Sequence, residues 1–471
     1  MKQLFLNPLI ITLVVFTALV YIVIGFQLIN ARLKRAEKFE MICIVLLLLS
    51  NSVIWPNIFG KFKPEVLYLP GKTIPSLVVQ IFLYVICCLF LYSRLKNKLN
   101  NFIFVIGSVI KFNPFFAGYI MILLLSFIWS EDPTYTLKAS IVCLIVTALF
   151  IYIGKEYSMV ELLNILLSYH TIVLILSLIY TSGHGINWSG VIGHKNPFSF
   201  VMNLSVILLY LQSIRLPKYK GLFLGLAALS VFCVQQAGSG MGKVLLVVLI
   251  SLLIFARFLK HLPAKLAFAC MGLFLAIGVS LAILIVENAE LIIVQKLGKD
   301  MTLTGRTYIW PVVIDAINKS PWLGYGYQGF WQPWRGLKNP GAVIKAKELV
   351  FIPMHSHNGY LDMGLDLGWV GLGLFIISLI INIYYGVNYF IKNNTPESLL
   401  PLVFFTWLSI SNVTENGINQ ISNGWLIYVL MTARLTMEMA DAQLKSGRFL
   451  QNSRHLDSLS LVNPVHPKTD Q

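Results

Sequence analysis

The sequence predicts an all-α, polytopic membrane protein with about 12 to 13 transmembrane helices and one long extracytoplasmic loop. Hydrophobic residues make up 57% of the 471 residues and charged residues only 12%, and the mean hydropathy is +0.76. Soluble domains carry about 25% charged residues, so this composition excludes that class. The apolar residues also recur in separate runs of about 20, the length that a helix needs to cross the hydrocarbon core.

Each of these runs is expected to form one membrane-spanning helix, because its residues are apolar on every side. The strands of a membrane barrel would instead alternate polar and apolar residues. The first run is too long for a signal peptide and no small-residue cleavage site follows it, so we expect it to remain as a span. The shorter run Phe102–Ile110 either lies at the interface or lengthens the next span. The expected spans cover residues 9–29, 40–59, 74–92, 114–129, 138–154, 162–181, 197–213, 221–237, 243–258, 264–286, 369–390, 399–413 and 424–438.

Positive charges predict the orientation, because cytoplasmic loops of membrane proteins retain Lys and Arg. The net charge is +16, but the basic residues are scattered among short loops, so they indicate membrane topology and no nucleic-acid partner. Most of them fall in alternate connections, at residues 32–38, 94–111, 215–220 and 257–265, and in the C-terminal tail. We therefore place these segments in the cytoplasm and the intervening loops outside.

Four segments follow from this arrangement. Residues 1–286 are expected to form a transmembrane helical bundle, and residues 287–368 an extracytoplasmic loop that carries the site. Residues 369–445 are expected to add the C-terminal transmembrane helices, and the polar residues 446–471 a cytoplasmic, disordered tail. A long loop on a compact bundle is more often functional than idle, so the loop is the first place to expect reactive residues.

Arg306 is the first candidate in this loop, within the motif TGRTYIW, before an apolar stretch that is expected to form a helix against the membrane. A guanidinium is always charged and donates two parallel hydrogen bonds, which suits phosphate oxygens. An interfacial arginine that reaches lipid headgroups is an equally weighted alternative.

His355 and His357 are the next candidates, in the motif MHSHNGYLD before a helix that continues into the eleventh span. An imidazole titrates near neutral pH, so it can accept a proton from a sugar hydroxyl or, as a cation, stabilise a departing phosphate. The start of a helix adds backbone N–H groups and a positive dipole end. A lone histidine is more often an interfacial residue, but two at alternate positions favour function. A metal site with His184 or His194 is a weaker alternative, and we expect none.

Asp362 and Asp366 follow one helical turn apart. Each carboxylate either orients a histidine or is an interfacial charge in contact with water, and we favour the second role for Asp366. Gly364 and Gly368 form a small-xxx-small pair, which is typical of close helix packing.

Three short outward turns add polar groups at the same depth. Lys195 and Lys243 bring positive charge there, and each turn is explained equally well as a simple connection between helices. Together with Arg306 and the histidines they predict a basic outer vestibule, which needs an acidic, membrane-bound partner. The turns are WSEDP at Trp129–Pro133, GHKNP at Gly193–Pro197 and QQAGSGMGK at Gln235–Lys243.

The motifs WSEDP, GHKNP, TGRTYIW, LGYGYQGFW and HSHNGYLDMGLDLGWVGLG, in this order between hydrophobic spans, resemble the O-antigen ligase and polymerase superfamily. The motifs GHKN and SHNGYLD are most similar to those of its exopolysaccharide-polymerase branch. The resemblance covers about Asn113 to Gly424. It implies a GT-C-like fold and a metal-independent glycosyltransferase without a cofactor, which uses undecaprenyl-diphosphate-linked glycans outside the bacterial cytoplasmic membrane. Ligases of this family pass the glycan to lipid A core, and polymerases pass it to the next lipid-linked repeat unit.

The resemblance also assigns roles to individual residues. The loop histidine of the family, its polar neighbour and the later glycines correspond to His357, Asn358, Gly368 and Gly371. The diphosphate-binding arginine corresponds to Arg306. A second family arginine has no arginine counterpart here, and Lys195 is the nearest cation. Its ammonium group is a point charge and cannot donate the two parallel hydrogen bonds of a guanidinium.

We therefore expect an inverting transfer in which Arg306 neutralises the donor diphosphate while His357 either takes the acceptor proton or assists phosphate departure. His355 is the expected third catalytic residue. Other expected partners are a glycan or lipid-linked acceptor, membrane lipids and a chain-length regulator. A transporter of anions or lipid-linked sugars is the opposing class, but it would place its charges at mid-membrane. Substrate contacts are expected from Lys195, Lys243, Asn196, Asn358 and Asp362.

Overall fold

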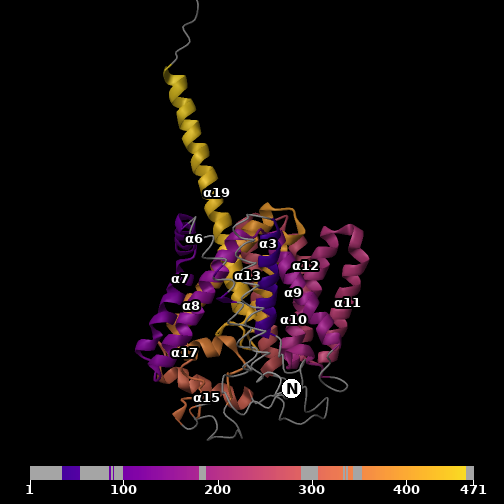
Figure 1. Cartoon of the computed structure of the whole chain (residues 1–471), viewed down its shortest axis with the longest axis vertical. Coiled ribbons are helices and arrows are strands. Elements are labelled where there is room, and N and C mark those ends of the chain that lie inside the picture. Colours follow the sequence, from indigo (N-terminus) through magenta and orange to yellow (C-terminus); the bar gives the residue numbers. More distant parts are fainter. Residues whose placement is uncertain are drawn as a thin grey trace, which may run out of the picture.

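The computed structural model describes residues 34–52, 84–85, 89, 99–179, 187–287, 306–332, 335, 338–342 and 353–462. The regular elements within these ranges are all helices, which confirms the all-α fold (Figure 1). They are α3 Lys34–Ser52, α6 Leu99–Phe112, α7 Pro114–Leu125, α8 Pro133–Glu156, α9 Met159–Ile179, α10 Lys195–Arg215, α11 Lys220–Ala237, α12 Gly240–Leu259, α13 Ala264–Glu287, α15 Arg306–Lys319, α17 Gly359–Lys392, α18 Leu400–Ser411 and α19 Asn423–Val462.

Seven helices of the described residues are long and apolar enough to cross a membrane: α8, α9, α10, α11 (counted with the preceding turn as 217–237), α12, α13 and α17. They agree with seven of the expected spans, so the protein is a multi-pass membrane protein. The expected span 9–29 and most of 74–92 lie outside the described residues, and the total of about 12 to 13 spans stays a prediction.

The run Phe102–Ile110 does not simply lengthen the next span. It belongs to α6, and the segments Ile103–Phe112 and Pro114–Ile128 meet at an angle of 106°. Asn113 ends the first segment and caps the second, because its side-chain oxygen accepts a hydrogen bond from the Phe116 amide. Pro114 then occupies the first turn of α7, where it needs no amide partner.

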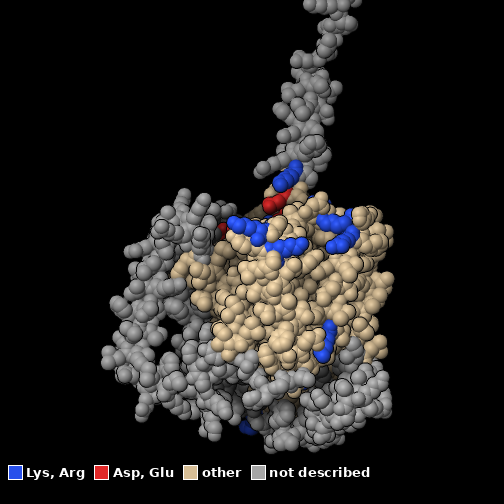
Figure 2. All heavy atoms as spheres, turned by 90° about the vertical axis from the view of Figure 1, so that its right-hand side faces the viewer, with Lys and Arg blue, Asp and Glu red and all other residues tan. Residues whose placement is uncertain are grey.

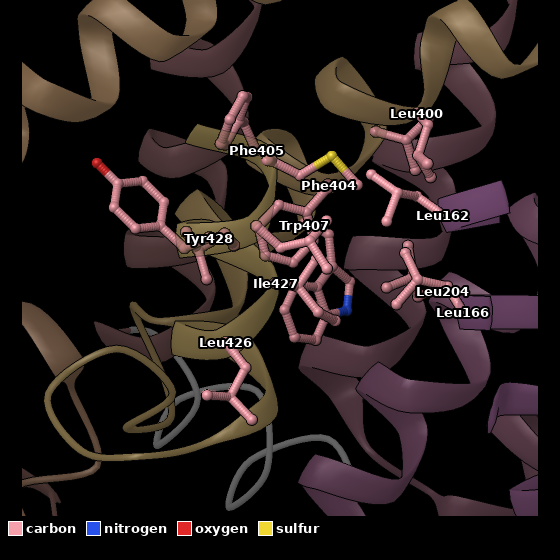
Figure 3. Close-up of a cluster of buried hydrophobic side chains, with 14 of the residues drawn as sticks. Leu162, Leu166, Leu204, Leu400, Phe404, Phe405, Trp407, Leu426, Ile427 and Tyr428 are labelled. Carbon is pink, nitrogen blue, oxygen red and sulfur yellow. The ribbon is translucent and has the colours of Figure 1, made fainter. Parts of the chain in front are cut away.

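The centre of the bundle is formed by α18 and α19. Every residue of α18 is buried, although the helix has only 12 residues. Figure 3 shows Phe404 and Trp407 of α18 on the side of leucines from the neighbouring helices, such as Leu204 of α10. Tyr428 of α19 points to the opposite side, where its ring contacts Phe375 and Phe405. Helix α18 and the first part of α19 are surrounded by other helices, so their composition need not match that of a lipid-facing span.

The two ends of the bundle differ. Figure 1 shows α15 lying across one end, which we call the α15 end, while α19 leaves the bundle at the opposite end. Figure 2 shows Lys and Arg side chains gathered along that opposite end, above a broad and largely uncharged face. We call it the basic end; it carries the connections after α10 and α12, with Lys218, Lys220, Arg257, Lys260 and Lys265.

The C-terminal segment differs from the disordered tail expected from residue 446, because α19 continues to Val462. The residues up to that point contain no proline, whereas Pro464 lies just beyond and cannot donate a backbone hydrogen bond. Residues 463–471 lie outside the described residues.

Candidate functional site

The α15 end is organised around a break in α17. Gly368 has φ 63° and ψ −169°, so the helix is interrupted and two sets of backbone groups lose their intrahelical partners. The segment 320–326 supplies replacements for both. The amides of Trp369 and Val370 donate to the carbonyls of Pro321 and Trp322, at 2.7 and 3.3 Å.

The carbonyl side of the break is satisfied in the same way. The amides of Tyr325 and Gly326 donate to the carbonyls of Leu365 and Asp366, at 2.8 and 2.9 Å. The loop and the broken helix thus exchange hydrogen bonds in both directions. Glycine is required at Gly368, because a Cβ atom there would lie 2.3 Å from the Trp322 carbonyl.

A small apolar core joins α15 to the first part of α17. Ile309, Val313 and Ile317 of α15 are buried with Trp331 and Leu365. The Tyr325 hydroxyl closes this core by donating to the Ala316 carbonyl, at 3.0 Å. Burial raises the pKa of the Tyr325 hydroxyl, which keeps it in the protonated, donating form.

The turn WSEDP holds the same loop from the other side. The Trp129 indole donates to the Leu323 carbonyl at 2.9 Å, and Glu131 lies 3.7 Å from the Arg335 guanidinium. Asp132 caps α8 through the amide of Tyr135. These contacts make the turn a structural support for the loop.

Asp362 and Asp366 are both buried, at 0% and 1% exposure. Asp362 accepts hydrogen bonds from the Trp331 indole at 2.8 Å and from the Ser356 amide at 2.9 Å. It therefore positions Ser356, the residue between the two histidines, as a carboxylate that orients a histidine would. We expected Asp362 to contact the substrate, but its side chain is fully buried.

The prediction that Asp366 is an interfacial charge in contact with water is wrong. Its Oδ2 atom accepts a hydrogen bond from the backbone N–H of Gln328 at 2.7 Å and another from the Asn419 side chain at 2.9 Å. Both donors belong to segments distant in the chain, which cover this face of the helix. Local spacing along the sequence could not reveal that cover.

The two histidines lie in a tight turn before α17. His357 has the left-handed φ of 58°, and its amide donates to His355 Nδ1 at 3.1 Å. The two rings lie 4.2 Å apart between centroids, at 67° to each other. The structure therefore brings the two candidate catalytic histidines into direct contact. Asn358 follows as the cap of α17, because its Oδ1 atom accepts from the amides of Tyr360 and Leu361.

Glu415 is the residue that the sequence interpretation missed. Its Oε2 atom lies 3.7 Å from His357 Nδ1, and its Oε1 atom accepts a hydrogen bond from the Asn196 side chain at 3.0 Å. Its carbonyl also accepts from the Gly359 amide, at 3.1 Å. The only signal in the sequence was a single carboxylate in the polar turn between the last two expected spans. Through this residue the structure joins the GHKN turn to the histidine turn.

The other predicted cations lie at the same end of the molecule. Lys195 begins α10, and its Nζ atom donates to the Asn187 side chain at 3.2 Å. Lys243 lies exposed in the first turn of α12, and no contact between described residues joins it to the histidines.

Arg306 is the first residue of α15, and nothing is described of its side chain. Its backbone position is one helical turn before Trp310, whose indole donates to the Ser356 carbonyl at 3.0 Å. The first turn of α15 therefore faces the histidine turn.

A metal site was the weaker alternative for the two histidines. Among the described residues, no three His, Cys, Asp or Glu side chains lie close enough together to hold a metal ion. His194 directly precedes α10, and His184 lies outside the residues that the structure describes.

Comparison with known proteins agrees with the resemblance in the motifs. Residues 225–376 match the family described as "O-Antigen ligase". The chain is also 26% identical over 314 residues to the exopolysaccharide production protein ExoQ of Rhizobium meliloti (strain 1021), which covers 63% of this chain and 70% of that protein. The expected similarity to O-antigen ligases and polymerases, and to their exopolysaccharide branch, is confirmed. The matched family range contains Arg306, both histidines and the break in α17, whereas Glu415 lies beyond it.

Proposed function

We propose that this protein is a glycosyltransferase that polymerises glycans carried on undecaprenyl diphosphate, at the outer face of a bacterial cytoplasmic membrane. The observation that carries the proposal is the contact of His357 with Glu415, which is itself bonded to Asn196. It gives an oriented imidazole directly before α17 and beside α15, the helix that lies across the end of the bundle opposite to the basic end. The positive-inside rule puts the basic end in the cytoplasm and the histidine outside.

The donor diphosphate would bind between the starts of α15 and α10. Arg306 begins α15 next to the histidine turn, and its guanidinium can donate two parallel hydrogen bonds to phosphate oxygens. Lys195 and the positive end of the α10 dipole add positive charge beside Asn196. Negative charge grows on the diphosphate as it leaves, so fixed cations at this place lower the barrier.

His357 would act on the acceptor. Because Nδ1 faces Glu415, the second ring nitrogen, Nε2, is the atom available to take the proton of the acceptor hydroxyl. The acceptor oxygen then forms a bond to the anomeric carbon from the face opposite to the departing diphosphate, and that carbon's bond to the diphosphate breaks. This displacement inverts the anomeric centre. Glu415 stabilises the imidazolium that results.

A ligase that passes the glycan to lipid A core is the second candidate, and the match to the O-antigen ligase family supports it. Both reactions use the same donor site and differ in the acceptor. The identity to an exopolysaccharide production protein favours polymerisation.

Reconstitution tests the proposal directly. The full-length protein in liposomes is given lipid-linked repeat units, and products are separated by length on a gel. We expect a ladder from the wild type and from His261→Ala, which changes an exposed histidine near the basic end, but none from His357→Ala. Lipid A core as a second acceptor distinguishes a ligase. A full ladder from a correctly folded His357→Ala variant would refute the catalytic role, and export of intact lipid-linked units by that variant would indicate a transporter.

A further inference from the structure

A groove opens between α10, α11 and α12, closer to the basic end of these helices than to the α15 end. It forms a cavity of about 360 Å³, with α10 as its floor and α11 and α12 as its walls. Most of the lining is apolar, with Val206 and Ile207 on α10, Leu224 and Val231 on α11, and Ile250 and Ile254 on α12.

The groove faces the lipid. All three helices are long and apolar enough to span the membrane, and Figure 2 shows the largely uncharged face on the α11 side of the molecule. Ile254 is 67% exposed and Ile250 42%, although both line the cavity. Such side chains would meet hydrocarbon and not water, so an acyl chain can fill the groove without losing hydration.

The groove has one polar end, formed by Tyr210 and Arg257. This end lies at the basic end of the bundle, because Arg257 is in the last turn of α12, next to the contacts of Lys260 with the end of α17. Arg257 is exposed, and among the described residues neither its guanidinium nor the Tyr210 hydroxyl has a hydrogen-bond or ion-pair partner. Lys260, one turn later, is by contrast bonded to the carbonyls of Phe390 and Asn393.

We propose that this groove holds one acyl chain of an anionic phospholipid from the leaflet at the basic end, with the lipid phosphate on Arg257. The charge pattern fits this occupant, because an apolar trough that ends in an unpaired guanidinium complements a chain that ends in a phosphate. The leaflet at the basic end is the one expected to be cytoplasmic and to carry negative surface potential. The groove is remote from the proposed donor site, so the inference does not depend on the glycosyltransferase activity.

Native mass spectrometry of the full-length protein in detergent tests the proposal. The protein is titrated with phosphatidylglycerol and with phosphatidylcholine of identical chains. Two variants address the groove: Arg257→Gln removes the phosphate partner, and Ala228→Phe fills the space with a side chain from α11. Two matched controls change exposed residues outside the groove: Lys265→Gln near the same end, and Leu222→Phe on α11.

The wild type and both controls should hold one phosphatidylglycerol more tightly than phosphatidylcholine. Arg257→Gln should bind phosphatidylglycerol about fivefold more weakly and lose the preference, since one charge near the surface contributes about that factor. Ala228→Phe should lose both lipids. Equal binding by Ala228→Phe and the wild type would overturn the proposal, as would a preserved preference in Arg257→Gln. A dimer that Ala228→Phe dissociates would overturn it too, because the occupant would then be a second copy of the chain.

Discussion

His357 Nδ1 and Glu415 Oε2 lie 3.7 Å apart, although the two residues come from turns separated by α17 and α18. The histidine side chain is 33% exposed and the carboxylate 13%, so the carboxylate stands behind the imidazole. This order leaves the imidazole accessible and its partner shielded, as positioning by a carboxylate requires.

Replacement of Glu415 by Gln should slow turnover about 100-fold with little change in KM, because the imidazolium loses its countercharge while substrate contacts remain. Steady-state kinetics in liposomes would measure this. Glu156→Gln, at the basic end, serves as the control. A merely structural Glu415 would give a variant with lower thermal stability and unchanged turnover per folded molecule.

Arg306→Ala should lower turnover with the lipid-linked donor by about 100-fold, because a cation is removed from the place where the leaving diphosphate gains charge. Arg306→Lys should recover part of that loss, since it restores the charge without the fork. Lys319→Gln, in the last turn of the same helix, is the matched control. Similar activity in Arg306→Ala and the control would remove Arg306 from the proposed site.

Gly368→Ala should destabilise the protein by about 1 to 3 kcal/mol, because a Cβ atom would meet the Trp322 backbone and the left-handed φ would be strained. Thermal unfolding in detergent would measure the change. Gly373→Ala, five residues further along α17, meets nothing within 4 Å and should leave stability unchanged. Equal melting temperatures for the two variants would contradict the geometry of the break.

Asp362→Ala should destabilise the histidine turn by about 1 to 3 kcal/mol, because the Trp331 indole and the Ser356 amide would remain buried without an acceptor. Asp362→Asn retains one acceptor oxygen and should lose less. Intrinsic tryptophan fluorescence during unfolding reports both variants. An Ala variant as stable as the Asn variant would show that the two hydrogen bonds contribute little.

The helical spans could be predicted from sequence because a span needs only a local run of apolar residues. The histidine turn and Arg306 could be selected because their motifs are contiguous. The break in α17 was not foreseen, because Gly368 lies within an otherwise helical pattern and its partners come from residues 320–326. Glu415 and the burial of Asp366 were missed for a related reason: their partners lie far away in the chain. The end of α19 at Val462 could not be predicted, because the polar residues after 445 are compatible with either a helix or a disordered tail, and composition alone does not distinguish the two.

The reciprocal hydrogen bonds between residues 320–326 and the break in α17 also restrict how the protein can move. Lifting that segment would break four backbone hydrogen bonds beside the membrane, and each group left unsatisfied in hydrocarbon costs several kcal/mol. The segment is therefore a fixed wall and not a lid. In the proposed polymerisation the growing glycan would have to pass this wall, so a gate that admits the next substrate would have to be formed by other parts of the chain.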